Sequence, residues 1–264
     1  MALGDRKLRQ LPVRSLAPNI LTVLGLCAGL TALRFALQGQ FEKAIIAVIV
    51  AAVIDALDGR VARFLKGATK FGAELDSLVD FVNFGVVPVM VLYLWNLRDL
   101  GGLGWIAVLG FAVCCALRLA RFNTALEAPD KPVWSSKFFV GVPAPSGAGL
   151  AILPVVLAFL GWDWIADSPF FVALYTGAIA ALMISRIPTF SFKGMSVRRD
   201  MVMPILLIVG LGAAVLLSYP WGFLTALGFG YLALIPFSIL RYRRYASGSE
   251  MLAAQADQDD APVP

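Results

Sequence analysis

Four aspartates are the first residues of the sequence whose types and spacing indicate chemistry. Asp55 and Asp58 are three residues apart, and Asp76 and Asp80 are four apart. Either spacing places both carboxylates of a pair on one face of a helix, one turn apart. All-oxygen ligands of this kind suit a hard divalent cation such as Mg²⁺ or Mn²⁺ better than zinc. The spacing therefore predicts a metal centre built by two neighbouring helices.

The sequence around these aspartates is apolar enough to lie in lipid. Of 264 residues, 59% are hydrophobic and 15% are charged, and the mean hydropathy is +0.81. Such a composition is typical of an integral membrane protein, and apolar runs near the length of a membrane-spanning helix recur along the chain. We predict an all-α, polytopic membrane protein with about eight transmembrane helices, at 18–38, 43–63, 72–95, 103–122, 146–162, 169–186, 201–218 and 222–240.

The basic residues predict the orientation. If the spans alternate in direction, 19 of the 22 Lys and Arg residues fall on one side of the membrane. Short cytoplasmic loops carry an excess of Lys and Arg, so both termini and the aspartates are expected on the cytoplasmic side of the inner membrane. The net charge of +5 then reflects topology and contact with anionic lipids, and it gives no reason to expect nucleic-acid binding.

We expect three parts in the chain: a basic cytoplasmic segment at 1–17, a transmembrane domain at 18–244, and a disordered tail at 245–264. The tail is polar, acidic and tipped with proline. The absence of histidine excludes an imidazole base, His metal ligands and a Ser-His triad. The three cysteines lie in apolar spans without the spacing of a zinc site, and Gly25 with Gly29 indicates close helix packing.

Two interpretations of the aspartates stand side by side. Interhelical salt bridges would balance their charge, with partners in the intervening segment at Arg60, Arg63, Lys66 and Lys70. They do not explain why the acids occupy helix faces while the bases gather towards the loop, and a metal centre does. Gly59 and Gly72 would let a ligand approach the backbone. Glu74 lies off the shared face and is expected to be an ordinary structural acid.

At this point the sequence resembles a family. The stretch D-x2-D-G-x2-A-R-x8-G-x3-D-x3-D, from Asp55 to Asp80, is similar to the signature of the CDP-alcohol phosphatidyltransferases. The resemblance implies a polytopic helical enzyme, expected to be a homodimer, that displaces CMP from a CDP-linked lipid. It implies that the four aspartates bind two divalent metals and that Asp80 is also the general base. It further implies that four positions form the nucleotide and phosphate pocket: Gly59, Ala62, Arg63 and Gly72.

Further stretches resemble the phosphatidylserine synthase branch of this family. They are FGAELDSLVDFVNFGVVP at 71–88, RLARFN at 118–123, KFFVGVPAPSGAG at 137–149 and SRIPTFSFKG at 185–194. Asn83 departs from the branch, which commonly carries serine there. The resemblance implies transfer of the phosphatidyl group from CDP-diacylglycerol to the hydroxyl of L-serine, giving phosphatidylserine and CMP.

Several further residues are candidates for binding. Asn19 and Thr22, in PNILT, can reach the diphosphate or its metals, or can form a polar helix start. Arg118 and Arg121 lie three apart on one helical face, and a guanidinium group pairs well with a carboxylate or phosphate. Asn123 can order the acceptor or cap the helix, and Lys137 can contact lipid phosphate or only mark the topology.

Alternatives remain open for the acceptor and for the class of protein. Glycerol 3-phosphate, an inositol phosphate or choline could replace serine, since phosphate-bearing acceptors also suit arginine. A cation-coupled transporter could use the acidic cluster as an ion site, and a lipid-binding scaffold would not need all four aspartates. Dependence on a CDP-linked lipid separates the enzyme from the transporter.

Overall fold

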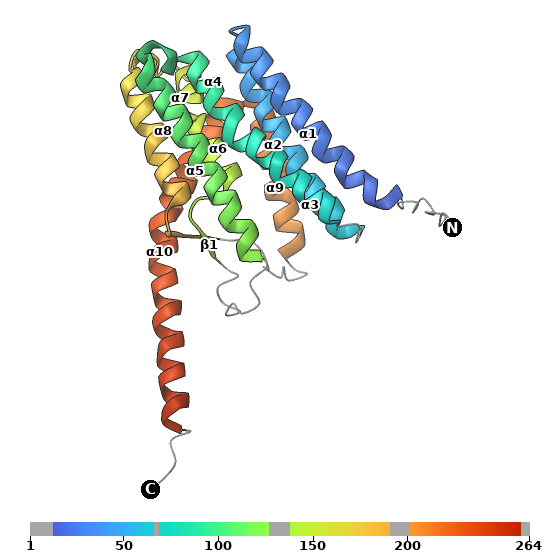
Figure 1. The fold of residues 1–264 in the computed structure, drawn as a ribbon, viewed down its shortest axis with the longest axis vertical. Helices are drawn as coiled ribbons and strands as arrows, with labels where there is room; N and C mark the ends of the chain where they lie inside the picture. Colours follow the sequence, from blue (N-terminus) through green and yellow to red (C-terminus); the bar gives the residue numbers. More distant parts are fainter. Residues whose placement is uncertain (1–12, 66–68, 127–137, 191–200, 260–264) are drawn as a thin grey trace, which may run out of the picture.

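The computed structural model describes residues 13–65, 69–126, 138–190 and 201–259, and it is a bundle of helices (Figure 1). The α-helices are α1 (Val13–Leu37), α2 (Phe41–Phe64), α3 (Lys70–Asp80), α4 (Val87–Trp95), α5 (Gly102–Leu126), α6 (Ala144–Ala151), α7 (Leu153–Phe159), α8 (Pro169–Ile184), α9 (Val202–Ser218) and α10 (Pro220–Asp259). Every stretch predicted to span the membrane falls on one or two of these helices.

Helix lengths confirm the helical class but not the number of spans. Within the described residues, four helical segments are long and apolar enough to cross a membrane: Leu16–Leu37, Lys70–Trp95, Gly102–Ala125 and Pro220–Arg241. Three apolar segments are shorter: Ala144–Phe159, Pro169–Ile184 and Val202–Ser218. The remaining predicted span is α2, which is 24 residues long but carries Asp55, Asp58 and Arg60 in its second half. Two of these charged residues, Asp55 and Asp58, belong to the predicted metal centre, which explains why this helix is less apolar than the others.

The outer surface of the bundle is apolar. Large hydrophobic side chains such as Leu24, Leu207 and Phe237 are exposed, and α9 has no buried residue at all. Soluble proteins rarely expose contiguous apolar surface of this extent, whereas lipid tails cover such side chains at no cost. The surface and the apolar helices together indicate a membrane protein.

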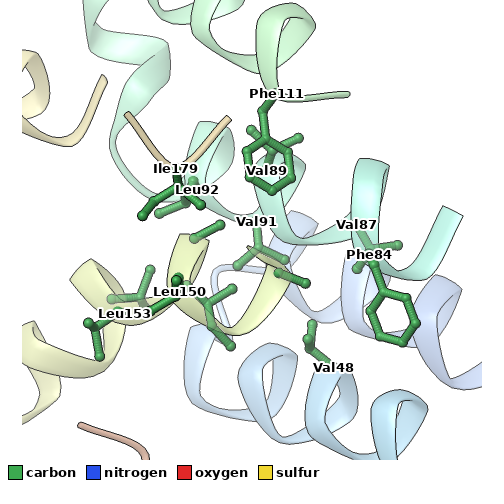
Figure 2. Packing of buried hydrophobic residues seen from close by; sticks show 14 of the residues in the cluster. Val48, Phe84, Val87, Val89, Val91, Leu92, Phe111, Leu150, Leu153 and Ile179 are labelled. Atoms are coloured by element: carbon green, nitrogen blue, oxygen red, sulfur yellow. The ribbon is translucent and has the colours of Figure 1, made fainter. Parts of the chain in front are cut away.

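Helix α4 forms the centre of the core. Val87, Val89, Val91 and Leu92 are all buried although they point in different directions around the helix, and a helix that is apolar all round lies inside a larger structure. Figure 2 shows these side chains with others from neighbouring helices: Val48, Phe84, Phe111, Leu150, Leu153 and Ile179. Helix α3, which carries Asp76 and Asp80, leads into α4 in the chain. The packing of α4 in the core therefore fixes the position of α3.

A π-helical segment, Phe81–Val86, joins α3 to α4 directly after Asp80. Such segments occur often at functional sites, and no feature of the sequence predicted this one. Asn83 lies in it, is buried, and packs against Gly29 of α1, where a Cβ atom would overlap the Asn83 side-chain oxygen. The predicted close packing at Gly29 is therefore found, and its partner is the π-helical segment.

A short antiparallel ribbon is the one departure from an all-α fold among the described residues. β1 (Phe138–Val140) pairs with β2 (Pro188–Phe190), with Phe139 opposite Thr189. The chain then turns at Gly141, which has φ 77° and would bring a Cβ atom against the carbonyl oxygens of Met183 and Ser185. The ribbon brings β2 beside α10.

The C-terminal segment differs from the expected disordered tail at 245–264. Helix α10 continues to Asp259 and extends below the bundle in Figure 1. The segment from 245 to 259 contains Ala, Met, Leu, Gln and Glu, which favour helix, so it prolongs the preceding helix. Composition alone suggested disorder because the segment is polar and has no apolar face to bury.

Candidate active site

Three aspartates meet between α2 and α3. Asp55, Asp76 and Asp80 each offer a carboxylate oxygen, and these oxygens all lie within 4.8 Å of one another. The three residues are half-buried. The i, i+4 spacing on α3 and the short connection between the two helices produce this meeting, as the sequence predicted.

Asp58 lies outside that group of three. It is 4% exposed, and its Oδ2 accepts a hydrogen bond of 2.9 Å from the hydroxyl of Thr22 on α1. The Thr22 hydroxyl also lies 3.0 Å from the carbonyl oxygen of Pro18, one turn earlier in α1. Thr22 was predicted to reach the diphosphate or its metals. In the structure it contacts a predicted metal ligand.

The salt-bridge interpretation finds no support in the described residues. No ion pair joins any of the four aspartates to Arg60, Arg63 or Lys70, and the side chains of all three are exposed. Lys66 lies outside the described residues. Oδ1 of Asp80 is buried and has no hydrogen-bond partner. Carboxylates this close repel unless a cation lies between them, so the residues present fit a divalent metal.

The start of α3 is built against α1. Thr69 caps the helix, its hydroxyl accepting a hydrogen bond of 3.0 Å from the backbone N–H of Gly72. A Cβ atom on Gly72 would lie 2.7 Å from Oδ1 of Asn19, so a larger residue at position 72 would displace the Asn19 side chain. The Asn19 side chain therefore lies at the N-terminal end of the helix that carries Asp76 and Asp80.

Gly59 lies in a different environment. A Cβ atom there would meet a single atom within 4 Å, Nη1 of Arg63 at 3.9 Å. Nothing in the packing of the described residues requires glycine at this position. The open space is consistent with a ligand that approaches the backbone. Nothing is described of the side chain of Ala62.

The predicted acceptor residues on α5 divide into separate roles. Arg118 is 7% exposed, its Nε is buried without a partner, and its guanidinium carbon lies 5.9 Å from the centre of the Phe122 ring. Arg121 is exposed and donates to the carbonyl oxygen of Ile184 at 2.8 Å, at the end of α8. Asn123 donates to the hydroxyl of Ser77 on α3 at 2.9 Å.

Of these, Arg118 alone is both buried and near the aspartates, since it interacts electrostatically with Asp80. Arg121 and Asn123 tie α5 to its neighbours. Lys137 lies outside the described residues. Thr69 and Ser77 were not predicted: Thr69 could have been recognised as a residue preceding an amphipathic helix, whereas Ser77 has no signal in the sequence.

Comparisons with known proteins show the family to which the sequence belongs. The sequence profile described as CDP-alcohol phosphatidyltransferase matches residues 15–184, and that described as CDP-alcohol phosphatidyltransferase 2 matches residues 200–236. A protein of Mycobacterium leprae is 41% identical over 236 residues, which cover 88% of this chain and 77% of the relative. Its name is CDP-diacylglycerol–serine O-phosphatidyltransferase.

Two more relatives bear the same name. The protein of Mycobacterium tuberculosis strain H37Rv is 38% identical over 237 residues, covering 89% of this chain and 82% of the relative. The protein of Bacillus subtilis is 32% identical over 176 residues, covering 67% of this chain and 90% of the relative. The resemblance found in the signature is thereby confirmed over most of the sequence. The chain belongs to the CDP-alcohol phosphatidyltransferase family.

Proposed function

We propose that this membrane protein transfers the phosphatidyl group from CDP-diacylglycerol to the hydroxyl of L-serine, giving phosphatidylserine and CMP. One observation carries the proposal: the carboxylates of Asp55, Asp76 and Asp80 meet between two helices of an apolar bundle. The names of the relatives supply the reaction class and the acceptor.

The reaction needs a base, which the site can provide. The serine oxygen attacks the phosphorus that carries diacylglycerol, the bond from that phosphorus to CMP breaks, and the serine proton passes to a carboxylate. The chain contains no histidine, and Asp80 has a buried oxygen without a partner. We assign Asp80 as the general base, which acts by position within hydrogen-bond reach of the hydroxyl.

The cofactor assignment follows from the same carboxylates. We propose that Asp55, Asp58, Asp76 and Asp80 hold two ions of Mg²⁺ or Mn²⁺, for which oxygen ligands are suited. When bound, the ions neutralise charge on the diphosphate and on the departing CMP. Thr22 holds the Asp58 carboxylate in place by its hydrogen bond, in the way outer residues orient metal ligands.

The remaining predicted residues are assigned to the substrates. Gly59, with open space above it, and Arg63 beside it would face the nucleotide and its phosphates, with Ala62 on the same helix. Asn19 and Gly72 would form the opposite wall at the start of α3. We keep Arg118 as the acceptor residue, whereas Arg121, Asn123 and Lys137 stay predictions without direct support.

For the topology we propose eight membrane crossings within residues 18–244, with both termini and the active site on the cytoplasmic side of the inner membrane. The turn between α1 and α2 and the turn between α4 and α5 both lie at the top of Figure 1, as alternating passes require. The Lys and Arg excess near the aspartates supports the orientation. A homodimer stays a prediction from the family resemblance.

The test is CMP release by purified protein from CDP-diacylglycerol, with Mg²⁺ or Mn²⁺ and a panel of acceptors. The panel holds L-serine, glycerol 3-phosphate, an inositol phosphate and choline. We expect release that depends on L-serine and divalent metal, stops with EDTA, and falls by at least about 10²-fold in Asp80→Asn, the lower limit for loss of a general base.

Each other outcome has a definite meaning. Release with a different acceptor would keep the enzyme class and contradict serine as the substrate. No release with any acceptor, from folded protein, would contradict the enzyme and favour the transporter. Full activity of Asp80→Asn would contradict the assignment of the base.

A further inference from the structure

A second group of polar side chains lies beside the aspartates, contributed by helices far apart in the sequence. Arg118 comes from α5, and Tyr231 comes from the middle of α10. Nε of Arg118 and the hydroxyl of Tyr231 are both buried without a hydrogen-bond partner, and the two side chains interact electrostatically. Most buried polar atoms are hydrogen-bonded, so unpaired atoms on two neighbouring side chains need an explanation.

The surroundings of Tyr231 are also polar. Its hydroxyl faces the hydroxyl groups of Ser146 on α6 and Thr189 on β2, although no pair has the geometry of a hydrogen bond. Thr189 already donates to the carbonyl oxygen of Gly141 at 2.8 Å. Side chains from α5, α6, α10 and β2 thus form one polar group, and Arg118 links this group to Asp80, whose Oδ1 is likewise unpaired.

Tyr231 also lies at the edge of an apolar cavity. The cavity holds about 530 Å³ and runs between α2, α6, α7 and α10. Its lining is apolar apart from Arg60, Ser146 and Tyr231. Tyr231 is therefore placed between an apolar space and Arg118, which in turn interacts with Asp80.

We propose that Tyr231, together with Arg118, binds the carboxylate of the acceptor amino acid. This proposal rests on the proposed function. Serine bears its carboxylate and its hydroxymethyl group on one carbon, so a carboxylate held by Tyr231 and Arg118 brings the hydroxyl towards Asp80. Both side chains supply donors, and hydrogen bonds between a guanidinium group and a carboxylate are the strong kind.

Charge favours a carboxylate over a phosphate at this site. Arg118 interacts with Tyr231 and supplies one positive charge, which matches the single negative charge of a carboxylate, while Arg60 lines the cavity from α2. A phosphate monoester carries about −1.5 to −2 at neutral pH. Tyr231 lies outside residues 15–184, which hold the aspartate signature, and inside residues 200–236, which match the second profile.

The test compares Tyr231→Phe with a matched control, Tyr175→Phe. The Tyr175 hydroxyl on α8 donates to the carbonyl oxygen of Leu150 at 2.8 Å and takes no part in the site. We expect Tyr231→Phe to raise the KM for L-serine about tenfold, as loss of a hydrogen bond to a charged group does. The KM for CDP-diacylglycerol should not change, and Tyr175→Phe should leave both KM values unchanged.

L-serinamide sharpens the comparison because a neutral amide replaces the carboxylate. Wild-type protein should prefer L-serine to L-serinamide, and Tyr231→Phe should lose about tenfold of that preference. If the variant does not fold, 3-fluorotyrosine introduced at position 231 gives a second measurement. Its ¹⁹F resonance should shift on addition of L-serine and not of L-serinamide.

Several results would overturn the proposal. A rise in the KM for CDP-diacylglycerol alone would assign Tyr231 to the lipid substrate. Three results would each show that Tyr231 has only a structural role. They are equal effects of the two tyrosine variants, an unchanged preference between the acceptors, and a ¹⁹F resonance that does not shift on addition of L-serine. Wild-type protein that releases CMP only with an acceptor lacking a carboxylate would overturn the proposed function together with this inference. If wild-type protein is active with serine and Tyr231→Phe leaves the KM for L-serine unchanged, the inference alone would be overturned.

Discussion

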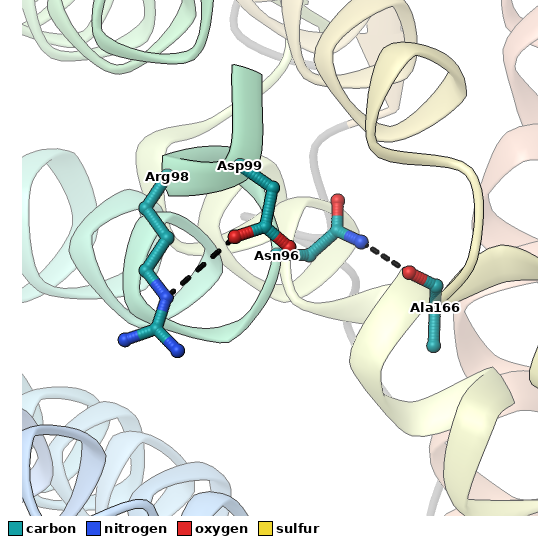
Figure 3. Close-up of polar contacts among 4 residues, drawn as sticks. All are labelled: Asn96, Arg98, Asp99 and Ala166. Atoms are coloured by element: carbon teal, nitrogen blue, oxygen red, sulfur yellow. Dashed lines mark hydrogen bonds and ion pairs between the residues drawn. The ribbon is translucent and has the colours of Figure 1, made fainter. Parts of the chain in front are cut away.

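The two ends of the bundle hold different kinds of polar groups. At the end where α4 is followed by α5, the side-chain nitrogen of the buried Asn96 donates to the carbonyl oxygen of Ala166, Oδ1 of Asn96 has no partner, and Arg98 and Asp99 form an ion pair of 3.8 Å (Figure 3). That end of α4 lies at the top of Figure 1. At the aspartate end, three carboxylates face one another without a described counter-ion, and Arg118 has an unpaired nitrogen.

The difference separates stability from function. The hydrogen bond from the Asn96 side-chain nitrogen to the Ala166 carbonyl stabilises the fold, because burying that donor unpaired would cost free energy. Unpaired groups at the aspartate end lower the stability of the fold when no ligand is bound. They are retained in sites where a bound ligand supplies their missing partners. The Arg98–Asp99 pair is 64% and 68% exposed and contributes little, as is usual for ion pairs in solvent.

The largest effect is expected from Asp76→Asn at the aspartate end. Removing one of the three close carboxylates should lower kcat/KM for CMP release by about 10²–10³-fold, the loss typical of removing electrostatic stabilisation. In EDTA, the variant should unfold at the same temperature as wild-type protein or a higher one, because one source of repulsion is gone. Kinetic assays and thermal unfolding in detergent give both values.

A metal titration sharpens this prediction. Mn²⁺ should raise the unfolding temperature of wild-type protein and raise that of Asp76→Asn less, since ligand that binds only the folded state stabilises it. A variant that is inactive but also unstable in EDTA would contradict the contrast between the two ends. It would mean that Asp76 supports the fold.

Asn96→Ala at the opposite end should give the reverse pattern. Loss of its hydrogen bond to the carbonyl oxygen of the exposed Ala166 should cost about 0.5–1.5 kcal/mol of stability, while kcat/KM stays unchanged. Asp99→Asn is the matched control, with a change below about 0.5 kcal/mol, as for most exposed positions. Thermal unfolding and the CMP assay measure both. Loss of activity at constant stability in Asn96→Ala would break the division between the ends.

Thr22→Val tests the contact between α1 and the aspartates. The variant keeps the shape of the side chain but loses the hydroxyl that donates to Asp58, so activity should fall about tenfold and half-maximal activity should need more metal. Thr31→Val is the control on the same helix, because the Thr31 hydroxyl donates to the carbonyl oxygen of Cys27 within α1. Equal effects of the two changes would argue against an orienting role for Thr22.

The sequence by itself determined the local features of this protein. Helix geometry turns a spacing of three or four residues into a shared helix face, as for Asp55 with Asp58 and Asp76 with Asp80. The predicted apolar runs fall on the observed helices for the same reason, because both patterns depend on a period of a few residues. Gly72 was also recognisable, although its reason was not: it allows close approach of Asn19 rather than only of a ligand.

Tertiary structure decided which of these groups meet. It gathered three of the aspartates and turned Asp58 towards Thr22, and it brought Tyr231 beside Arg118. It also introduced the π-helical segment after Asp80 and the short β-ribbon. These contacts join segments far apart in the chain through the packing of whole helices around α4. No local spacing encodes such packing, because the position of each helix depends on the side chains of all its neighbours.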